Sequence, residues 1–445
     1  MAARLEFDVS VGPAGRRREA SAPLRLLVFG DFSRAPASER PPLARRPTLR
    51  VDVDSLDDVI GRLRPKLALP AGEIAFARVA DFHADQLVAR LEMFKALTEK
   101  RTHPPATNED LERLLGKAPE GSAPRIIAPP ANELDALIHN IVTPHIVRDT
   151  SAETQSYQAG VDAALAEHLR ALLHAPAFQS LEAVWRGVHW LISSLELDEN
   201  LQLHLFDITR EEILADIVNA QGKVSETGLY RALVDRWRNV PGGEGWSAIA
   251  ALFEFGPSDA DVGLLAALGI IASQAGGPLL AGAERALSDE DGEALAGWNA
   301  LRGSEVAQWI ALGAPRVLLR RPYGKRSDPI EAFPFEECVG APAQEELLWG
   351  HAALALALLI GRAFMDRGWE MEPGDAREID DLPAYTFVRE GQTEMQPCGE
   401  RPLTERAINQ LLSAGLVPLA SRRDRHAVVA IRFQSIADPP APLAW

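Results

Sequence analysis

Cysteine is almost absent from this sequence: its 445 residues include only Cys338 and Cys398, which do not form a C-x-x-C pair. So few cysteines exclude a secreted domain held together by disulfides and fit a protein of the reducing cytoplasm. Long apolar runs are also missing. The longest, residues 347–360, is shorter than the roughly 18 residues of a membrane span, so we expect a buried core helix there. Residues 1–9 alternate between polar and apolar side chains, so we expect no export signal and no membrane insertion.

Positive charge is scarce as well. The sequence has 46 Lys and Arg residues against 63 Asp and Glu residues, which gives a net charge of −17 at pH 7. This balance argues against a general binder of nucleic acid or of anionic membranes, because phosphate groups are bound by clustered cations. Hydrophobic residues at 47% and charged residues at 24% are typical of a folded globular protein. The length exceeds the roughly 250–300 residues of a single core, so we expect two or more domains.

The common motifs of nucleotide, hydrolase and metalloenzyme sites do not occur in the sequence. It contains no G-x-x-x-x-G-K-[ST], no G-x-G-x-x-G, no G-x-S-x-G and no H-E-x-x-H. We therefore expect no catalytic residue, no cofactor and no metal. Glu254, between Phe253 and Phe255, is the most suggestive carboxylate. Two interpretations remain open: a general acid with a raised pKa, or, as we favour, a carboxylate at the end of a strand with an arginine partner.

The first hundred residues have the pattern of a small α/β unit. Residues 24–29 form an aliphatic run that predicts a buried strand, and residues 56–63 predict a helix with Ser55 as its N-cap. Residues 73–79 predict a second strand, and apolar residues then recur at helical spacing from Leu87 onward.

Proline, glycine and serine cluster between residues 101 and 131, which is typical of a linker. We therefore predict a small α/β domain at 1–118, a linker at 119–131 and a larger α/β domain at 132–445.

The larger part contains the stronger signals. Thr209 and Glu212 form a capping box, and strands alternate with helices from residue 201 onward, which predicts mixed sheets flanked by helices, an α/β (α+β) fold. We also expect a helix at residues 345–364. One predicted helix has a continuous apolar stripe at steps of three and four residues. The stripe consists of Phe178, Leu181, Trp185, Val188, Ile192 and Leu195.

Two basic clusters stand out from the acidic background. The first comprises Arg316, Arg320, Arg321, Lys325 and Arg326, and the second comprises Arg422, Arg423 and Arg425. No aromatic residues alternate with these cations as a stacking platform for bases would require. We therefore consider all eight as possible contacts to an acidic protein partner, with a plain solvated surface as an equally good interpretation.

Several stretches match a known family in order along the chain. Residues 24–32 (LRLLVFGDF), 52–59 and 74–88 (IAFARVADFHADQLV) resemble the small subunit, TssB, of the type VI secretion contractile sheath. From residue 134 the sequence resembles the large subunit, TssC. The matching stretches are residues 172–179, 181–191 (LEAVWRGVHWL), 252–256, 314–324 (APRVLLRRPYG), 348–353, 398–400, 403–405 and 415–419.

This resemblance implies a non-enzymatic structural subunit, here a fusion of the small and large subunits. It implies assembly with other copies or other sheath subunits around an inner tube protein, contacts with baseplate components, and a sheath-recycling ATPase as a further partner. The family's large subunit continues well beyond a strand such as the one we expect at residues 427–433, whereas this sequence ends at Trp445. We therefore expect a reduced acceptor region for the arms of neighbouring subunits. A non-polymerising sheath paralogue, acting as a cap, adaptor or baseplate-linked component, is the alternative, and a hydrolase is a remote one.

Overall fold

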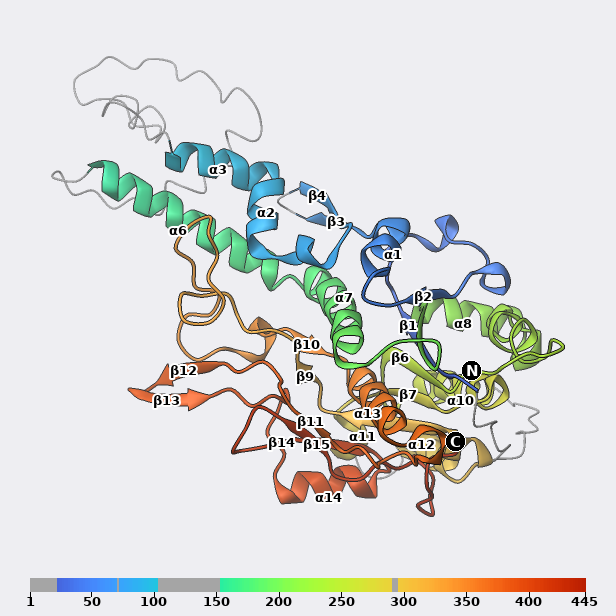
Figure 1. The fold of residues 1–445 in the computed structure, drawn as a ribbon. Coiled ribbons are helices and arrows are strands. Elements are labelled where there is room, and N and C mark those ends of the chain that lie inside the picture. Colours follow the sequence, from blue (N-terminus) through green and yellow to red (C-terminus); the bar gives the residue numbers. More distant parts are fainter. Residues whose placement is uncertain (1–21, 70–71, 103–152, 290–294) are drawn as a thin grey trace. The chain divides into compact units, whose positions relative to one another are not determined.

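The computed structural model describes residues 22–69, 72–102, 153–289 and 295–445 (Figure 1). The linker predicted at 119–131 lies outside these ranges, so the predicted domain boundaries stay a prediction. Contacts group the chain into two compact units. Unit 1 comprises Met1–Pro65, Ser180–Arg320 and Leu348–Trp445, and unit 2 comprises Lys66–Gln179 and Arg321–Leu347.

Unit 1 is built on one large mixed sheet. Among the described residues it has nine strands in the order β11-β15-β14-β8-β7-β6-β1-β5-β2. The six strands from β14 to β5 run parallel to their neighbours, whereas β2, β15 and β11 join antiparallel at the two edges. The strands are β1 (Leu24–Gly30), β2 (Leu49–Val51), β5 (Leu201–Asp207), β6 (Ala248–Phe255), β7 (Leu279–Ala283), β8 (Ile310–Ala314), β11 (Glu378–Ile379), β14 (Val417–Ser421) and β15 (Val428–Ala430). The predicted α/β class is confirmed.

Strand β1 lies inside this sheet, between two strands that come much later in the sequence. Its register with β5 runs from Leu24 opposite Leu201 to Gly30 opposite Asp207, and on its other side Leu26 lies opposite Ala248 of β6. Six of its seven residues are buried. An aliphatic strand buried on both faces is typical of the interior of a parallel sheet, which explains why β1 has no polar and apolar alternation.

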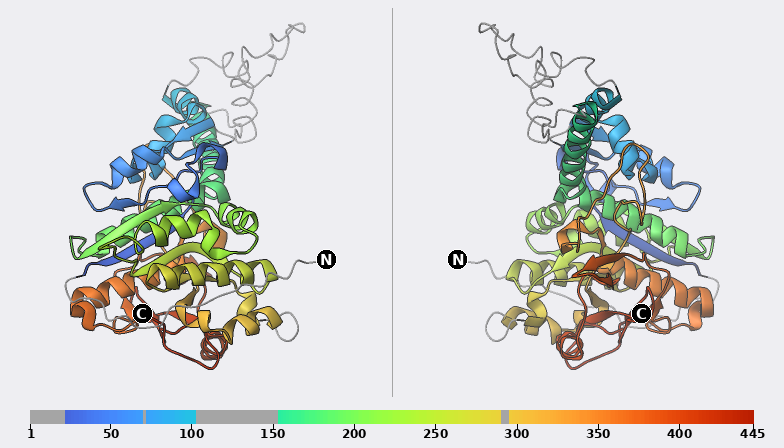
Figure 2. Two further views of the ribbon diagram at one scale, coloured as in Figure 1. Left: turned by 90° about the vertical axis from the view of Figure 1, so that its right-hand side faces the viewer. Right: turned by 90° about the vertical axis from the view of Figure 1, so that its left-hand side faces the viewer.

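Helices cover both faces of the sheet (Figure 2). On one face, α10 (Asp259–Ala275) packs on side chains of β6, β7 and β8 such as Ile249 and Ile310. On the other face lies α13 (Ala352–Arg367), which contacts the same three strands. A Cβ atom at Gly313 of β8 would lie 3.1 Å from the Cβ of Ala352, so glycine lets α13 approach the sheet closely. No helix among the described residues is long and apolar enough to cross a membrane.

The remaining helices and strands of unit 1 surround this core. They are α1 (Leu56–Leu63), α8 (Arg210–Asn219), α9 (Gly228–Tyr230), α11 (Ala286–Asp289), α12 (Ala296–Arg302), α14 (Glu405–Ser413), and the two-stranded pairs β9 (Val317–Leu318) with β10 (Trp349–Gly350) and β12 (Thr386–Arg389) with β13 (Gln392–Met395). The capping box predicted for Thr209 and Glu212 is present at the start of α8.

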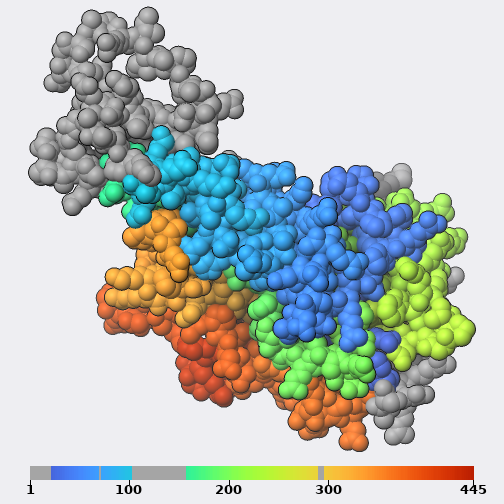
Figure 3. All heavy atoms as spheres, turned by 45° about the horizontal axis from the view of Figure 1, so that its top comes forward, coloured from blue at the N-terminus to red at the C-terminus, as the bar shows by residue number. Residues whose placement is uncertain are grey.

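Unit 2 has a core of aromatic and aliphatic side chains. Its elements are β3 (Lys66–Leu69), β4 (Gly72–Ala75), α2 (Ala84–Arg90), α3 (Glu92–Thr102) and α6 (Glu153–Leu173). Phe76 stacks on Phe82 with ring centroids 4.2 Å apart, and both rings contact Phe178. Helix α3 contacts α6, buries Phe94 and Leu97 and exposes Glu92 and Lys95. This part of the chain is light blue in Figure 3.

One local prediction holds in part and another is wrong. Ser55 is the N-cap residue of α1, which runs over the predicted residues, but its side chain makes no capping hydrogen bond. Its hydroxyl instead accepts from the Asp52 N–H at 3.0 Å and donates to the Asp52 carboxylate at 2.7 Å. The helix predicted at residues 345–364 begins only at Ala352. Residues of β10 pair with β9, and His351 then caps the helix by accepting a hydrogen bond from the Ala353 N–H on its Nδ1.

A buried ion-pair network holds the loop after β1 against the start of α8. The side chains of Arg40 and Arg46 are 2% and 4% exposed, and both donate to Glu212, at 2.9 Å and 2.6 Å. Asp207 accepts hydrogen bonds from the N–H groups of Phe32 and Ser33. Burial raises the pKa of Glu212, but the Arg46 hydrogen bond and the Thr209 N–H outweigh it and lower the pKa below its usual value. The carboxylate is therefore held in its charged form.

Helix α7 (Pro176–Ser194) carries the predicted apolar stripe, and all six of its residues are buried, including Leu195 just beyond the helix end. Trp185 is the largest of them. Its ring lies 5.2 Å from that of Phe32, and its Nε1 donates to the Phe32 carbonyl at 3.2 Å. The stripe is therefore a core contact.

We predict that Trp185→Ala destabilises the fold by about 3–5 kcal/mol, because it removes buried apolar area and a hydrogen bond and leaves a cavity. Urea unfolding monitored by circular dichroism measures the change. Trp185→Phe is the control and should lose less, because a ring remains against Phe32. Equal stability of Trp185→Ala and the wild type would contradict the assignment of the stripe to the core.

Candidate functional site

The eight basic residues predicted as partner contacts have different environments in the structure. Arg316, Arg320 and the three arginines at 422–425 belong to unit 1, whereas Arg321, Lys325 and Arg326 belong to unit 2. Some of their charges are neutralised within the fold and others are exposed to solvent. We describe each group in turn.

Arg316 follows strand β8 and is held by carboxylates of its own chain. Its Nε and Nη2 atoms donate to Glu400 at 2.9 Å and 2.6 Å, a bidentate geometry, and its Nε lies 3.7 Å from Glu254 Oε1. The Glu400 hydrogen bonds, opposed by burial, raise the pKa of Arg316 above its usual value. This arginine is engaged within unit 1.

Glu254 lies near the end of β6 and has the arginine partner that the favoured interpretation expects. Burial raises the pKa of Glu254 above its usual value, Arg316 lowers it, and the charges of Glu400 and Glu284 raise it again. The carbonyl of Glu254 also accepts a hydrogen bond from Arg210 at 2.8 Å. The arrangement is that of a carboxylate in a small charged cluster at the carboxyl end of the sheet.

Arg320 is a buried structural cation. Its side chain is 8% exposed, and its Nε donates at 2.9 Å to Glu182, whose side chain is fully buried on α7. Glu182 also accepts from Arg186 at 2.6 Å, so one carboxylate lies between two guanidinium groups. Removing one partner of such a buried group leaves an uncompensated charge, so Arg320 stabilises the fold.

Lys325 and Arg326 lie on an exposed loop, residues 321–326, which we call the basic loop. The loop is anchored from beneath by Tyr323, which is 1% exposed and whose N–H donates to the buried Glu337 at 2.7 Å. The Gly324 N–H donates to the Asp328 carbonyl at 2.9 Å and closes the turn. A rigid base therefore presents two exposed cations, with Arg321 also exposed beside them.

A cavity of about 620 Å³ adjoins the basic loop within unit 2. Lys325 lines it together with Arg101 and Arg170 and with the rings of Phe333 and Phe335. Arg170 packs over the Phe335 ring at 5.7 Å. Val339, which is 76% exposed, completes this wall. Glu331 and Glu336 line the cavity as well, so its wall carries charges of both signs.

The second predicted cluster occupies the turn between β14 and β15. Arg422, Arg423 and Arg425 are all exposed. Arg422 pairs with Asp424 at 3.2 Å, and Arg425 pairs with Glu378 at 3.1 Å. Exposed ion pairs of this kind contribute little stability and leave the side chains able to exchange partners.

Metal ligands do not converge in the described parts of the chain: no group of three or more His, Cys, Asp or Glu residues there could hold a metal ion.

Two features of the structure were not predicted from the sequence. One is the buried network of Arg40, Arg46 and Glu212, whose two arginines precede the glutamate by 172 and 166 residues. The other is a groove between α12 and α14, which no motif indicates because its lining residues come from separate helices.

Comparison with known proteins matches two families to consecutive regions. Residues 155–437 match the VipB family, described as "EvpB/VC_A0108, tail sheath N-terminal domain". Residues 2–117 match the family described as "Type VI secretion system, VipA, VC_A0107 or Hcp2". The type VI secretion system sheath protein TssC1 of Pseudomonas aeruginosa is 29% identical over 341 residues, which cover 72% of this chain and 66% of that protein. The chain thus spans just under two thirds of the length of this relative.

We predict opposite effects for two neighbouring carboxylates. Glu400→Gln should destabilise the fold by about 1 kcal/mol at pH 7, because it removes the charge that Arg316 binds. Glu254→Gln should leave stability unchanged or raise it, because the pKa of Glu254 is raised in the folded state.

The pH dependence distinguishes the two. A raised carboxyl pKa means that the stability associated with Glu254 is present below its unfolded pKa and is lost as pH rises through its folded pKa. The stability of Glu254→Gln relative to the wild type should therefore increase from pH 4 to pH 7, as urea unfolding at both values would show. A loss at pH 7 larger than that of Glu400→Gln would contradict this.

Proposed function

The chain belongs to the tail sheath family of type VI secretion systems, and from this we propose that it is a structural subunit of a contractile sheath. One structural observation carries the proposal. Strand β1 comes from the region that matches VipA, and its neighbours β5 and β6 come from the region that matches VipB. The two family regions therefore share one continuous sheet, which makes them one building block.

Having both regions in one chain has a direct consequence for assembly. Separate subunits would have to meet at a limiting concentration, whereas linked ones associate at a high effective concentration and always in a ratio of one to one. We propose that each chain is a complete repeating unit, which assembles with other copies of itself. The role is mechanical and non-enzymatic, with binding surfaces in place of a catalytic centre.

The proposed role implies further partners. The unit would surround an inner tube protein, contact baseplate components and be a substrate for a sheath-recycling ATPase. It would act in the cytoplasm, where the buried thiols of Cys338 and Cys398, which form no disulfide, would stay reduced.

Electron microscopy of the purified full-length protein tests the main proposal. We expect tubes or rings with a regular repeat, formed by the protein alone or together with the sheath proteins and tube protein of its own host. Discrete particles under all these conditions would overturn the sheath role and favour a non-polymerising cap, adaptor or baseplate-linked paralogue.

We further propose that the basic loop contacts an acidic surface of a neighbouring subunit or partner. Lys325 and Arg326 are exposed, and the loop is held rigidly by Tyr323, so little conformational freedom is lost on binding. The arginines at 422–425 are a second exposed group that such a contact could use, whereas Arg316 and Arg320 are engaged within the fold.

Replacing Lys325 and Arg326 together by Glu should change stability by no more than about 0.5 kcal/mol, because both side chains are exposed. Assembly should weaken most at low salt, where ion pairs between subunits contribute most. Sedimentation of assemblies at several salt concentrations measures the effect.

The matched control reverses two other exposed cations, Arg231→Glu with Arg432→Glu, and makes the same change in net charge. Full-strength assembly of the Lys325/Arg326 variant at low salt, or equal weakening by the control, would contradict a specific contact.

A further inference from the structure

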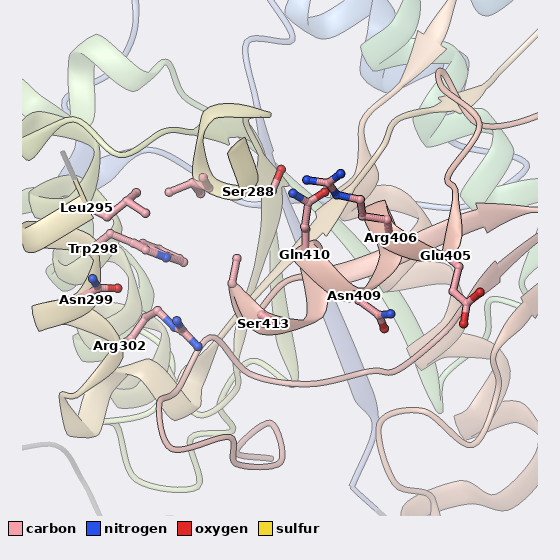
Figure 4. Close-up of a pocket in the computed structure, with 12 residues that line it drawn as sticks. Ser288, Leu295, Trp298, Asn299, Arg302, Glu405, Arg406, Asn409, Gln410 and Ser413 are labelled. Atoms are coloured by element: carbon pink, nitrogen blue, oxygen red, sulfur yellow. The ribbon is translucent and has the colours of Figure 1, made fainter. Parts of the chain in front are cut away.

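The groove between helices α12 and α14 in unit 1 is separate from the basic loop and from the charged cluster around Glu254. It has a volume of about 690 Å³, within the range of sites that bind small molecules and short peptides. Figure 4 shows its two walls facing each other, with Leu295, Trp298, Asn299 and Arg302 on one side and Arg406, Asn409, Gln410 and Ser413 on the other. The residues of each set have the spacing i, i+3, i+4 and i+7, which places each set on one helix face.

The α12 wall contains an unsatisfied hydrogen-bond donor. Trp298 is 1% exposed, and its Nε1 has no hydrogen-bond partner among the described residues. The ring points into the groove in Figure 4. A buried donor without an acceptor costs free energy, and tryptophan in folded proteins usually finds one. An acceptor supplied by a bound molecule would satisfy it.

Arg302 adds a cation that its own chain neutralises only in part. Its side chain is 9% exposed, and its Nε donates to the Ile436 carbonyl at 2.9 Å. Among the residues that the structure describes, Arg302 pairs with Asp438, whose Oδ2 is 3.7 Å from Nη1, beyond hydrogen-bond distance, and whose side chain is 59% exposed. Burial, opposed by Asp438, lowers the pKa of Arg302. Arg406 lies exposed across the groove, and Glu405 is the single anion among the described residues that line it.

The rest of the lining indicates the chemistry of the ligand. Asn299, Asn409 and Gln410 have side-chain amides that both donate and accept, as the alternating N–H and C=O groups of a peptide require. Leu287 and Leu295 add an apolar wall for one aliphatic side chain. Two cations with a carboxylate at the rim are too few for a polyphosphate or nucleic acid, but they match a single carboxylate.

We propose that this groove binds a short acidic peptide segment of a partner protein. In this arrangement a carboxylate lies between Arg302 and Arg406, a backbone carbonyl accepts from Trp298 Nε1, and an aliphatic side chain contacts Leu295. The groove is thus a docking site distinct from the basic loop.

The test begins with selection of random seven-residue peptides displayed on phage against the full-length protein. The selected sequences should share an Asp or Glu next to an aliphatic residue. The most enriched peptide, labelled with fluorescein, is then titrated by fluorescence anisotropy with the wild type and variants.

Arg406→Ala should weaken binding about tenfold, the effect of losing a hydrogen bond to a charged group. Asn409→Ala should weaken it several-fold, and Trp298→Phe should do the same by removing the indole donor. Arg406 and Asn409 are exposed, so their variants should remain folded, as circular dichroism will verify. The matched control, Arg432→Ala, removes an exposed cation outside the groove and should leave affinity unchanged.

The sequence EDGEA at residues 290–294 has the same acidic chemistry as the proposed ligand, so the test includes a control for it. Replacing Glu290 and Glu293 by Gln and Asp291 by Asn should leave peptide affinity unchanged if the groove is available to a partner. The proposal would be overturned if the peptide bound only to the variant in which residues 290, 291 and 293 are neutralised, and not to the wild type. So would enrichment of no peptide, of peptides without a carboxylate, or equal affinity of Arg406→Ala and the wild type.

Discussion

The large sheet is continuous only because of strand β1. This strand lies between β5 and β6, and, in the described part of the chain, its hydrogen bonds are the only ones that join the strands on its two sides. β1 pairs with β5 along its whole length and with β6 over four residues, and its side chains are buried on both faces. Without it, β5 and β2 would lose their connection to the rest of the sheet, and β5 and β6 would each expose an unpaired edge. Unpaired edges in an aliphatic sheet promote aggregation, so this strand is a requirement of the fold.

The loop after β1 strengthens the same connection with charge. Arg40 and Arg46 reach Glu212 at the start of α8, and the backbone after Gly30 donates to Asp207 at the end of β5. Because these ion pairs are almost fully buried, they stabilise the fold only while each charge has an opposite partner. The loss of one partner would leave a buried charge. The two family regions are therefore joined by both hydrogen bonds and ion pairs within unit 1.

Local patterns predicted much of this architecture. The aliphatic run of β1, the stripe on α7 and the capping box of α8 all reflect short-range periodicity or spacing, which a sequence displays directly. The predictions failed where tertiary contacts decide the outcome. The start of α13 depends on pairing between β9 and β10, and the role of Arg320 depends on Glu182, 138 residues away in the sequence. The groove between α12 and α14 joins two helices about a hundred residues apart, so no local pattern could reveal it.

The position of β1 also determines when the chain can fold. Phe32, just after β1, bonds to a partner 175 residues later, and β6 follows later still. A ribosome that adds about 5–20 residues per second therefore completes both neighbouring strands only some tens of seconds after it has made β1. For that time an aliphatic strand remains without either neighbour, and its closure must overcome the entropy of a long loop. Synthesis of this protein therefore passes through an obligatory interval in which this interior strand is exposed, and that interval is when chaperone protection matters most.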